Sequence, residues 1–234
     1  LNALVPVQEG KLFIGDFDLR PKQKGYKKQL KTLRSRVGMV FQYPEYQLFA
    51  DTVFNDVAFG VNNFFPNLGK EEVAGRVRLA LTAVGLDYDE VKDRSPFDLS
   101  GGQKRRVAIA GVLATEPDIL VLDEPVAGLD PVGKTTLMNL LHSISSPTRT
   151  IVIVSHDMNE VCENCSRIAV FEDGKIKNSG TPEEVFSDFS LHLRLELPLV
   201  AKVKNALEKV GCKLDCKLKT QDLIDEITNK FKNR

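Results

Sequence analysis

The chain has 234 residues, enough for one sizeable hydrophobic core or for a core with a small appendage. Lysine plus arginine and aspartate plus glutamate number 32 each, so the net charge is zero and no overall basic field favours nucleic acid as a partner. No apolar run approaches the roughly 18 residues that a membrane-spanning helix needs, and no signal segment opens the chain. We therefore expect a soluble, cytosolic protein.

The N-terminal part of the chain alternates between short strands and helices. Residues 11–19 alternate like one half-exposed strand, and residues 37–41 form a second apolar run that ends at Gln42. A basic loop and short helix at residues 22–36 lie between them, with charges typical of a solvated face. From about residue 52 to 86, apolar residues recur near the helical period of 3.6, so we expect a helical insert there.

Strands and helices alternate regularly in the second half. Apolar runs at residues 119–123, 151–155 and 168–171 are separated by helical patterns near residues 132–144 and 158–165. Apolar strands joined by helices predict a parallel sheet covered on both faces. The fold class is therefore α/β.

The composition shifts beyond about residue 189. Two amphipathic pieces follow, at residues 193–210 and 220–231. They predict a small α-rich unit, and we expect the chain to divide into a core at 1–189 and an extension at 190–234.

Four cysteines form two close pairs that would suit a four-thiolate zinc site: Cys162, Cys165, Cys212 and Cys216. The first pair lies in a segment that reads as helix. Reduced thiols without metal are the favoured interpretation, and zinc is the alternative.

The motif Leu-Ser-Gly-Gly-Gln at residues 99–103 leads into a basic and then apolar helix. Its hydroxyl and backbone N–H groups lie at the predicted helix N-terminus, a favourable place for an anion. Glycine also lets the backbone approach a phosphate closely. The motif therefore predicts an anion site, suited to phosphate, at Ser100, Gly101 and Gly102.

A second motif is the apolar strand that ends in Asp123 and Glu124. Asp123 ends a buried strand, where open parallel sheets bind their ligands, and suits the shell of Mg²⁺. Glu124 would face an attacking water as general base or water orienter. Two solvated acids at a strand end are the alternative interpretation.

Two polar residues follow other predicted strands. Gln42 precedes the turn-forming sequence Tyr-Pro-Glu, and His156 follows the run at residues 151–155. Alone, such a glutamine is more often a surface residue, and such a histidine is more often structural. Their assignment depends on the motifs around them.

Residues 99–103 and 119–125 together resemble the signature loop and the Walker B strand of ATP-binding-cassette (ABC) ATPases. Gln42 then resembles the Q-loop glutamine that touches Mg²⁺ and water, and His156 the switch histidine that senses the γ-phosphate. Residues 127–130, Ala-Gly-Leu-Asp, resemble the D-loop, whose aspartate here is Asp130.

The resemblance implies a P-loop NTPase (RecA-like) core with a helical subdomain near residues 48–115. It also implies binding of ATP and Mg²⁺, and a dimer with two composite sites. In such a dimer, Ser100 to Gln103 complete the ATP site of the opposite subunit, and Asp130 lies at the dimer seam.

Residues 41–49, 95–103 and 122–131 are similar to the ATP-binding subunits of energy-coupling factor transporters, and residues 122–131 look more like the second of their two ATPases. This implies a heterodimer, with a homodimer as the alternative, on the cytoplasmic face of the membrane. The partners would be a transmembrane coupling subunit and a substrate-binding membrane subunit. The cargo would be vitamins or transition-metal ions such as cobalt and nickel. The tail from residue 190 resembles that family's dimerisation extension.

Residues 128–135 also satisfy the P-loop pattern of glycine, four residues and Gly-Lys-Thr. The D-loop resemblance already explains their first half, and Pro131 removes an N–H group that a phosphate cradle needs. We expect Lys134 to be an exposed helical lysine. No other convincing Walker A loop precedes the motifs, so we expect a chain that begins just after that loop's helix and is inactive alone.

Two other functions fit the same motifs. An ABC ATPase of DNA repair or chromosome architecture would share them, but those proteins usually insert a long coiled coil, and no sustained heptads occur here. A catalytically incomplete fragment would offer only its signature loop to a partner.

Overall fold

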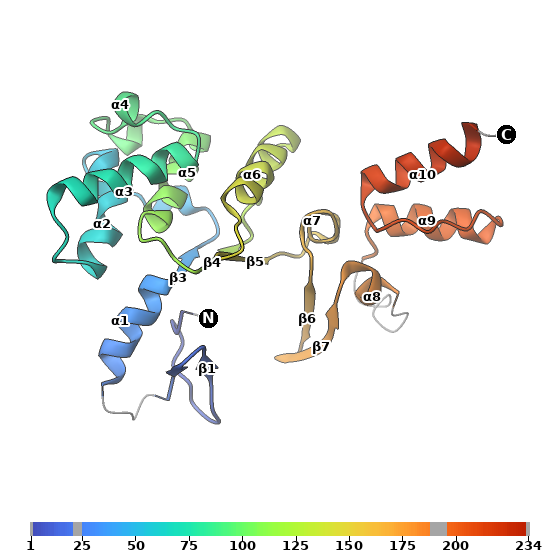
Figure 1. Cartoon of the computed structure of the whole chain (residues 1–234), viewed down its shortest axis with the longest axis horizontal. Helices are drawn as coiled ribbons and strands as arrows, with labels where there is room; N and C mark the ends of the chain where they lie inside the picture. The colour runs from blue at the N-terminus through green and yellow to red at the C-terminus, as the bar shows by residue number, and fades with distance from the viewer. Residues whose placement is uncertain (1, 21–24, 188–195, 233–234) are drawn as a thin grey trace. The chain divides into compact units, whose positions relative to one another are not determined.

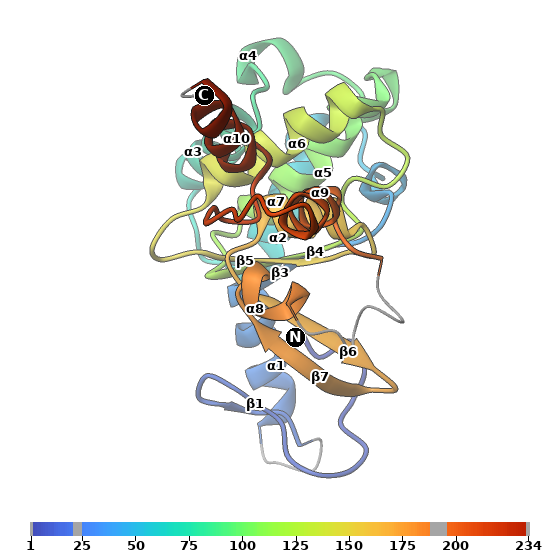
Figure 2. The ribbon, with the colours of Figure 1, turned by 90° about the vertical axis from the view of Figure 1, so that its right-hand side faces the viewer.

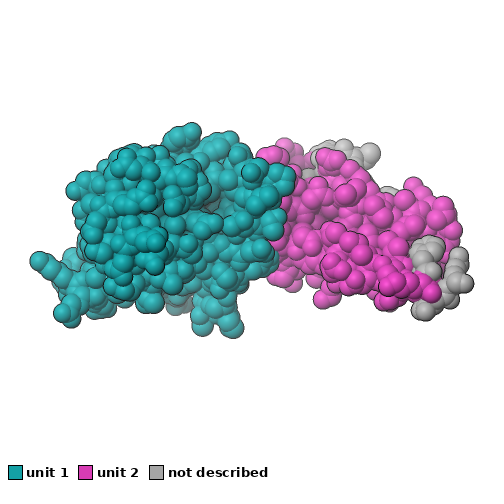
Figure 3. All heavy atoms as spheres, turned by 90° about the horizontal axis from the view of Figure 1, so that it is seen from above, with its two compact units in different colours: residues 1–154 teal, residues 155–234 magenta. Residues whose placement is uncertain are grey.

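The computed structural model describes residues 2–20, 25–187 and 196–232 (Figure 1). They form two compact units, Leu1–Val154 and Ser155–Arg234, which are coloured separately in Figure 3. The boundary expected at residue 189 lies outside the described residues and stays a prediction. Within the described ranges, no helix has both the length and the apolar character that a membrane span requires.

A three-stranded parallel sheet organises the first unit. Its strands are β3 (Val37–Val40), β4 (Ile119–Asp123) and β5 (Thr150–Val154), in the order β3-β4-β5. In this register Val40 pairs with Leu122 and Asp123 pairs with Val154. The expected α/β class with a parallel sheet is confirmed.

Helices α5 (Gly101–Leu113) and α6 (Pro131–Ile144) cover one face of this sheet, as Figures 1 and 2 show. Leu120 and Leu122 of β4 are fully buried in the core that this face shares with the helices. Helices α2 (Val53–Phe64), α3 (Lys70–Ala83) and α4 (Tyr88–Val91) extend the same core, so the helical insert predicted near residues 52–86 is confirmed.

Helix α1 (Tyr26–Arg36) and a small hairpin cover the other face. The hairpin consists of β1 (Phe13–Ile14) and β2 (Phe17–Asp18), paired antiparallel. The prediction of one strand over residues 11–19 was therefore wrong. The chain reverses at Gly15, whose φ of 54° is in the left-handed region that glycine adopts at little cost.

In its described residues, the second unit contains a β-hairpin and four helices. They are α7 (Met158–Asn164), β6 (Ile168–Glu172), β7 (Lys175–Gly180), α8 (Pro182–Phe186), α9 (Leu199–Lys209) and α10 (Thr220–Lys232). Strand β6 pairs antiparallel with β7, so the expectation that residues 168–171 join the parallel sheet was wrong. Asp173 and Gly174, both with positive φ, make the tight turn between these strands.

Side chains of α7 tie α10 into this unit. Glu163 accepts hydrogen bonds from the backbone N and the hydroxyl of Thr220, both at 3.1 Å. The Cys162 thiol donates to the Leu218 carbonyl at 3.1 Å, and burial raises the pKa of Cys162 to about 11. All four cysteines are free thiols, and no three His, Cys, Asp or Glu side chains cluster as metal ligands in the described ranges.

Candidate active site

The carboxyl edge of the parallel sheet brings together three of the expected site residues. Asp123 is half-buried and ends β4, with Glu124 directly after it. Strand β3 ends at Val40, level with Leu122, so Gln42 lies just beyond the same edge. Binding crevices of open parallel sheets lie at such edges. His156 follows Val154 by two residues, is exposed, and belongs to the second unit.

Glu124 begins a tight turn in a strained conformation. Its φ is 46°, in the left-handed region that a residue other than glycine rarely adopts. Its N–H donates to the Val154 carbonyl at 2.9 Å, and its carbonyl accepts from the N–H of Ala127 at 3.1 Å. These two main-chain hydrogen bonds thus fix the backbone from which the Glu124 side chain extends.

The signature loop is an open helix N-terminus. Ser100 is the N-cap of α5, with Oγ accepting from the N–H of Gln103 at 3.3 Å. The Gln103 side chain accepts from the N–H of Ser100 at 3.0 Å, which completes a capping box. A Cβ added at Gly101 or Gly102 would meet no heavy atom within 4 Å. Gly101 and Gly102 are exposed, and their N–H groups have no intrahelical acceptors, so they are accessible to an anion.

Asp130 is the N-cap of α6. Its Oδ1 accepts a hydrogen bond from the N–H of Gly133 at 2.7 Å, with Pro131 in the first turn. The Thr135 hydroxyl donates to the Pro131 carbonyl at 3.0 Å. Within the P-loop pattern of residues 128–135, the Gly133 N–H and the Thr135 hydroxyl are therefore already hydrogen-bonded at the start of α6. Lys134 lies on α6, as expected, but is half-buried rather than exposed.

Sequence reasoning missed an ion pair between Arg105 on α5 and Glu45 on η1 (Pro44–Gln47). Burial by itself would raise the pKa of the Glu45 carboxyl, but its hydrogen bonds and the charge of Arg105 together hold that pKa below its usual value. Sixty positions separate the two residues. Arg105 is the middle residue of the basic run at residues 104–106, and nothing in that run marks it as the buried one.

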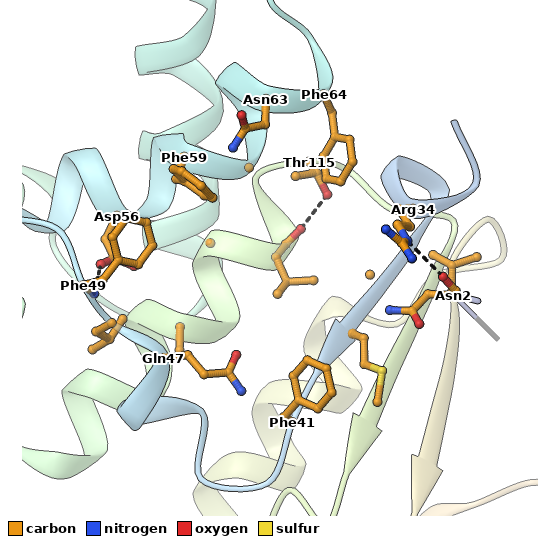
Figure 4. Close-up of a pocket in the computed structure, with 18 of the residues that line it drawn as sticks. Asn2, Arg34, Phe41, Gln47, Phe49, Asp56, Phe59, Asn63, Phe64 and Thr115 are labelled. Carbon is orange, nitrogen blue, oxygen red and sulfur yellow. Dashed lines mark hydrogen bonds between the residues drawn. The ribbon is translucent and has the colours of Figure 1, made fainter. Parts of the chain in front are cut away.

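An apolar hollow of about 360 Å³ lies beside the site in the first unit (Figure 4). Phe41, Phe49, Phe59 and Phe64 are among its lining residues. The rings of Phe49 and Phe59 meet edge to face, with centroids 4.8 Å apart. Asp56 accepts from the backbone N–H groups of Phe49 and Ala50 at 2.9 Å each, which holds this segment against α2.

The acidic edge suits Mg²⁺ held together with a nucleotide. Mg²⁺ prefers oxygen ligands and is commonly bound by one or two carboxylates, water and substrate phosphates. Asp123 offers a carboxylate and Gln42 an amide oxygen at the same edge. The described ranges hold no group of three or more acidic, His or Cys side chains that would cage a metal without phosphate.

Comparison with known proteins agrees with this geometry. The family described as ABC transporter matches residues 1–127. The energy-coupling factor transporter ATP-binding protein EcfA2 of Clostridioides difficile is 43% identical over 215 residues, covering 90% of this chain and 73% of the relative. The EcfA2 protein of Caldanaerobacter subterraneus subsp. tengcongensis is 46% identical over 214 residues, covering 90% and 72%.

Two solved structures share the fold. CbiO1 of Clostridium perfringens, part of the ABC transporter complex cbiONQ, matches with a TM-score of 0.68 and 37% identity, over 90% of this chain and 78% of that one. The ATP-binding cassette MJ0796, a dimer bound to ADP and Pi, matches with a TM-score of 0.63 and 28% identity, over 77% of each chain.

These matches place the chain in the class of ABC-type ATPases and confirm the expected P-loop NTPase fold. The chain belongs to the ABC transporter family and, within it, to the ATP-binding proteins of energy-coupling factor transporters. The resemblance predicted from residues 122–131 to the second ATPase type is confirmed.

Proposed function

We propose that this protein binds and hydrolyses ATP as one of two ATPase subunits that power uptake by an energy-coupling factor importer. The observation that carries the proposal is the pair Asp123 and Glu124 at the carboxyl end of β4, with Gln42 beyond the neighbouring strand. The family membership supports the same assignment.

Each of the expected site residues has a distinct task in this proposal. Asp123 and Gln42 hold Mg²⁺, which neutralises charge on the phosphates when it is bound. Glu124 accepts the proton of the water whose oxygen attacks the γ-phosphorus, while the bond from that phosphorus to the ADP oxygen breaks. His156, after β5, responds to the γ-phosphate. The products are ADP and inorganic phosphate.

The signature loop would act on a different nucleotide. Its open helix N-terminus presents the Ser100 hydroxyl and the N–H groups of Gly101 and Gly102 outward. Such donors stabilise negative charge on a γ-phosphate held by a partner subunit. Asp130 would lie at the seam between the two subunits. We infer a heterodimer of related ATPases, with a homodimer as the alternative.

The apolar hollow is the proposed docking site for a helix of the membrane-embedded coupling subunit. Phe49 and Phe59 are 59% and 51% exposed, although they are large and apolar. Exposed aromatic side chains are typical anchors of protein interfaces. The protein would therefore work at the cytoplasmic face of the membrane, and a separate membrane subunit would select the cargo, either vitamins or transition-metal ions such as cobalt and nickel.

The chromosome-type alternative receives no support from the helical region. Between β3 and β4, the longest described helix is α3, with 14 residues, which is too short for an arm of a coiled coil. The region packs into the same core as the sheet.

Co-purification from detergent-solubilised membranes tests the proposal. The wild type should bring down integral membrane proteins, and the complex that it forms with its partner subunits should hydrolyse Mg-ATP. Phe59→Glu should lose the integral membrane proteins and the hydrolysis that depends on them. Phe171→Glu is the matched control, because Phe171 is also exposed, at 67%, but lies on β6 in the other unit. Wild type recovered with DNA and without membrane proteins would contradict the proposal.

A further inference from the structure

Arg105 is buried between Glu45 and the turn that follows Glu124, and the tasks assigned above do not involve it. Of the residues that the structure describes, it is the only charged one that is buried, with 5% of its surface exposed. A buried guanidinium is costly unless its N–H groups are paired. Its partners are one carboxylate and two backbone carbonyls, and they belong to two different loops at the edge of the sheet.

The first partner lies on the Q-loop turn, which we define as residues 42–47. Nε and Nη2 of Arg105 donate to Oε2 and Oε1 of Glu45, both at 3.1 Å. Glu45 is on η1, three residues after Gln42. A two-point pair between a guanidinium and a carboxylate fixes orientation as well as distance. Displacement of η1 would therefore turn the guanidinium.

The other partners lie on the turn that begins with Glu124. Nη1 of Arg105 donates to the Pro125 carbonyl at 3.0 Å, and Nη1 and Nη2 donate to the Ala127 carbonyl at 3.3 and 3.2 Å. Pro125 directly follows Glu124, and the N–H of Ala127 closes the turn onto the Glu124 carbonyl. These hydrogen bonds stabilise the turn in which Glu124 has its left-handed conformation.

A second contact joins the same two loops. Tyr43 Cε1 lies 3.3 Å from where a Cβ at Gly128 would be, and Gly128 has a φ of 74°. The Q-loop turn and the D-loop therefore touch beside the ion pair. Together the two contacts form a continuous path of packed and hydrogen-bonded groups from η1 to Glu124.

We propose that Arg105 is a positioning residue that couples movement of the Q-loop turn to the placement of Glu124. It acts through Glu45 on one side and through the carbonyls of Pro125 and Ala127 on the other, without touching the nucleotide. This inference rests on the proposed function, because it takes Glu124 as the base. If the ion pair only stabilised the fold, its removal would not lower turnover while leaving nucleotide binding unchanged.

Steady-state kinetics of the assembled transporter test the coupling. Arg105→Lys keeps the charge but loses the two-point geometry. We expect kcat to fall at least about tenfold while KM for ATP stays within about threefold, and Glu45→Gln to do the same. Because both changes break one path, Glu45→Gln/Arg105→Lys should lose no more than either single variant. Unchanged kcat in the folded variants, or losses that multiply in the double variant, would overturn the coupling.

Arg76→Gln is the matched control. Arg76 lies on α3, is 19% exposed and pairs with Glu116 at 3.3 Å and Glu72 at 3.7 Å. Its loss should lower stability and leave kcat unchanged.

Hydrogen exchange without nucleotide gives a readout that needs no catalysis. In Glu45→Gln, the amides of Ala127 and Leu129 should exchange at least about fivefold faster than in wild type, and in Arg76→Gln they should not. Unchanged exchange would overturn the coupling even in an active ATPase. If Glu45→Gln showed the faster exchange but the wild-type complex did not hydrolyse ATP, the coupling would stand and the proposed function would be contradicted.

Discussion

Ser100 and Gln103 satisfy each other's backbone N–H groups at the start of α5, at 3.0 and 3.3 Å. This reciprocal pairing engages the Ser100 oxygen and the Gln103 amide in holding the loop. The N–H groups of Gly101 and Gly102 then remain as outward donors of the first turn. The capping box therefore holds the loop in shape by itself, which would lower the cost of the phosphate binding proposed here.

Replacing Ser100 distinguishes its proposed contact with a phosphate from its role as a helix cap. Ser100→Ala should lower the free energy of unfolding by about 0.5–2 kcal/mol and should also abolish most ATP turnover, because the hydroxyl is lost from the partner's site. Thr181→Ala is the control, since Thr181 and Glu184 form the same capping box on α8. It should cost similar stability in urea denaturation with turnover intact. Equal losses of turnover in both variants would contradict the assigned role.

Lys134 tests the second interpretation of residues 128–135. Because Asp130 and Pro131 occupy the groups that would cradle a phosphate, Lys134→Ala should leave ATP turnover of the assembled ATPase within about twofold of wild type. Radiolabelled ATP hydrolysis measures this. If Lys134→Ala abolished activity, the pattern would be a true P-loop, and the D-loop assignment would be wrong.

Close packing of β3 against α5 predicts a stability effect at Gly38. A Cβ there would lie 2.4 Å from Val112 Cγ1 and 3.2 Å from Pro117 Cγ, and Val112 is β-branched and stiff. Gly38→Ala should destabilise the protein by about 1–3 kcal/mol. Gly75→Ala, on α3 with nothing within 4 Å, should instead stabilise it by about 0.5–1 kcal/mol. Relative to wild type, the urea midpoint should fall in Gly38→Ala and rise in Gly75→Ala. A Gly38→Ala variant as stable as wild type would refute this packing.

The Glu45 carboxyl predicts a component of acid sensitivity. Its pKa is lowered in the folded protein from 4.5, so its stabilisation is present above that value and is lost as the pH falls through the folded pKa. Between pH 6 and about pH 3, the stability of wild type should therefore fall more steeply than that of Glu45→Gln. Parallel curves of unfolding free energy against pH would show that Glu45 is not the group responsible.

Sequence patterns predicted the elements whose signals are local. Strand β4 and helix α6 have clear apolar patterns, and their predicted bounds agree with the structure to within a residue. The hairpin at Gly15 was missed because alternation continues across it. Strand β7 was missed because Lys175–Gly180 is polar and mostly exposed, so its pairing with β6 leaves no period in the sequence.

The candidate site divides in the same way. The sequence could predict Ser100, Asp123 and Glu124 because each belongs to a motif of adjacent residues. Arg105 and Glu45 do not, because their relationship exists only after α5 packs on η1. Tertiary contacts of this kind leave no mark in the spacing of one sequence.

The most direct test of the central claim is the Glu124→Gln variant of the assembled ATPase with Mg-ATP. Because glutamine is nearly isosteric but cannot accept the proton of the attacking water, turnover should fall by about 100-fold or more while ATP affinity is retained. Sedimentation should then show a closed dimer that persists with ATP and dissociates with ADP. Undiminished ATP turnover by this variant would contradict the account, because Glu124 would not be the base.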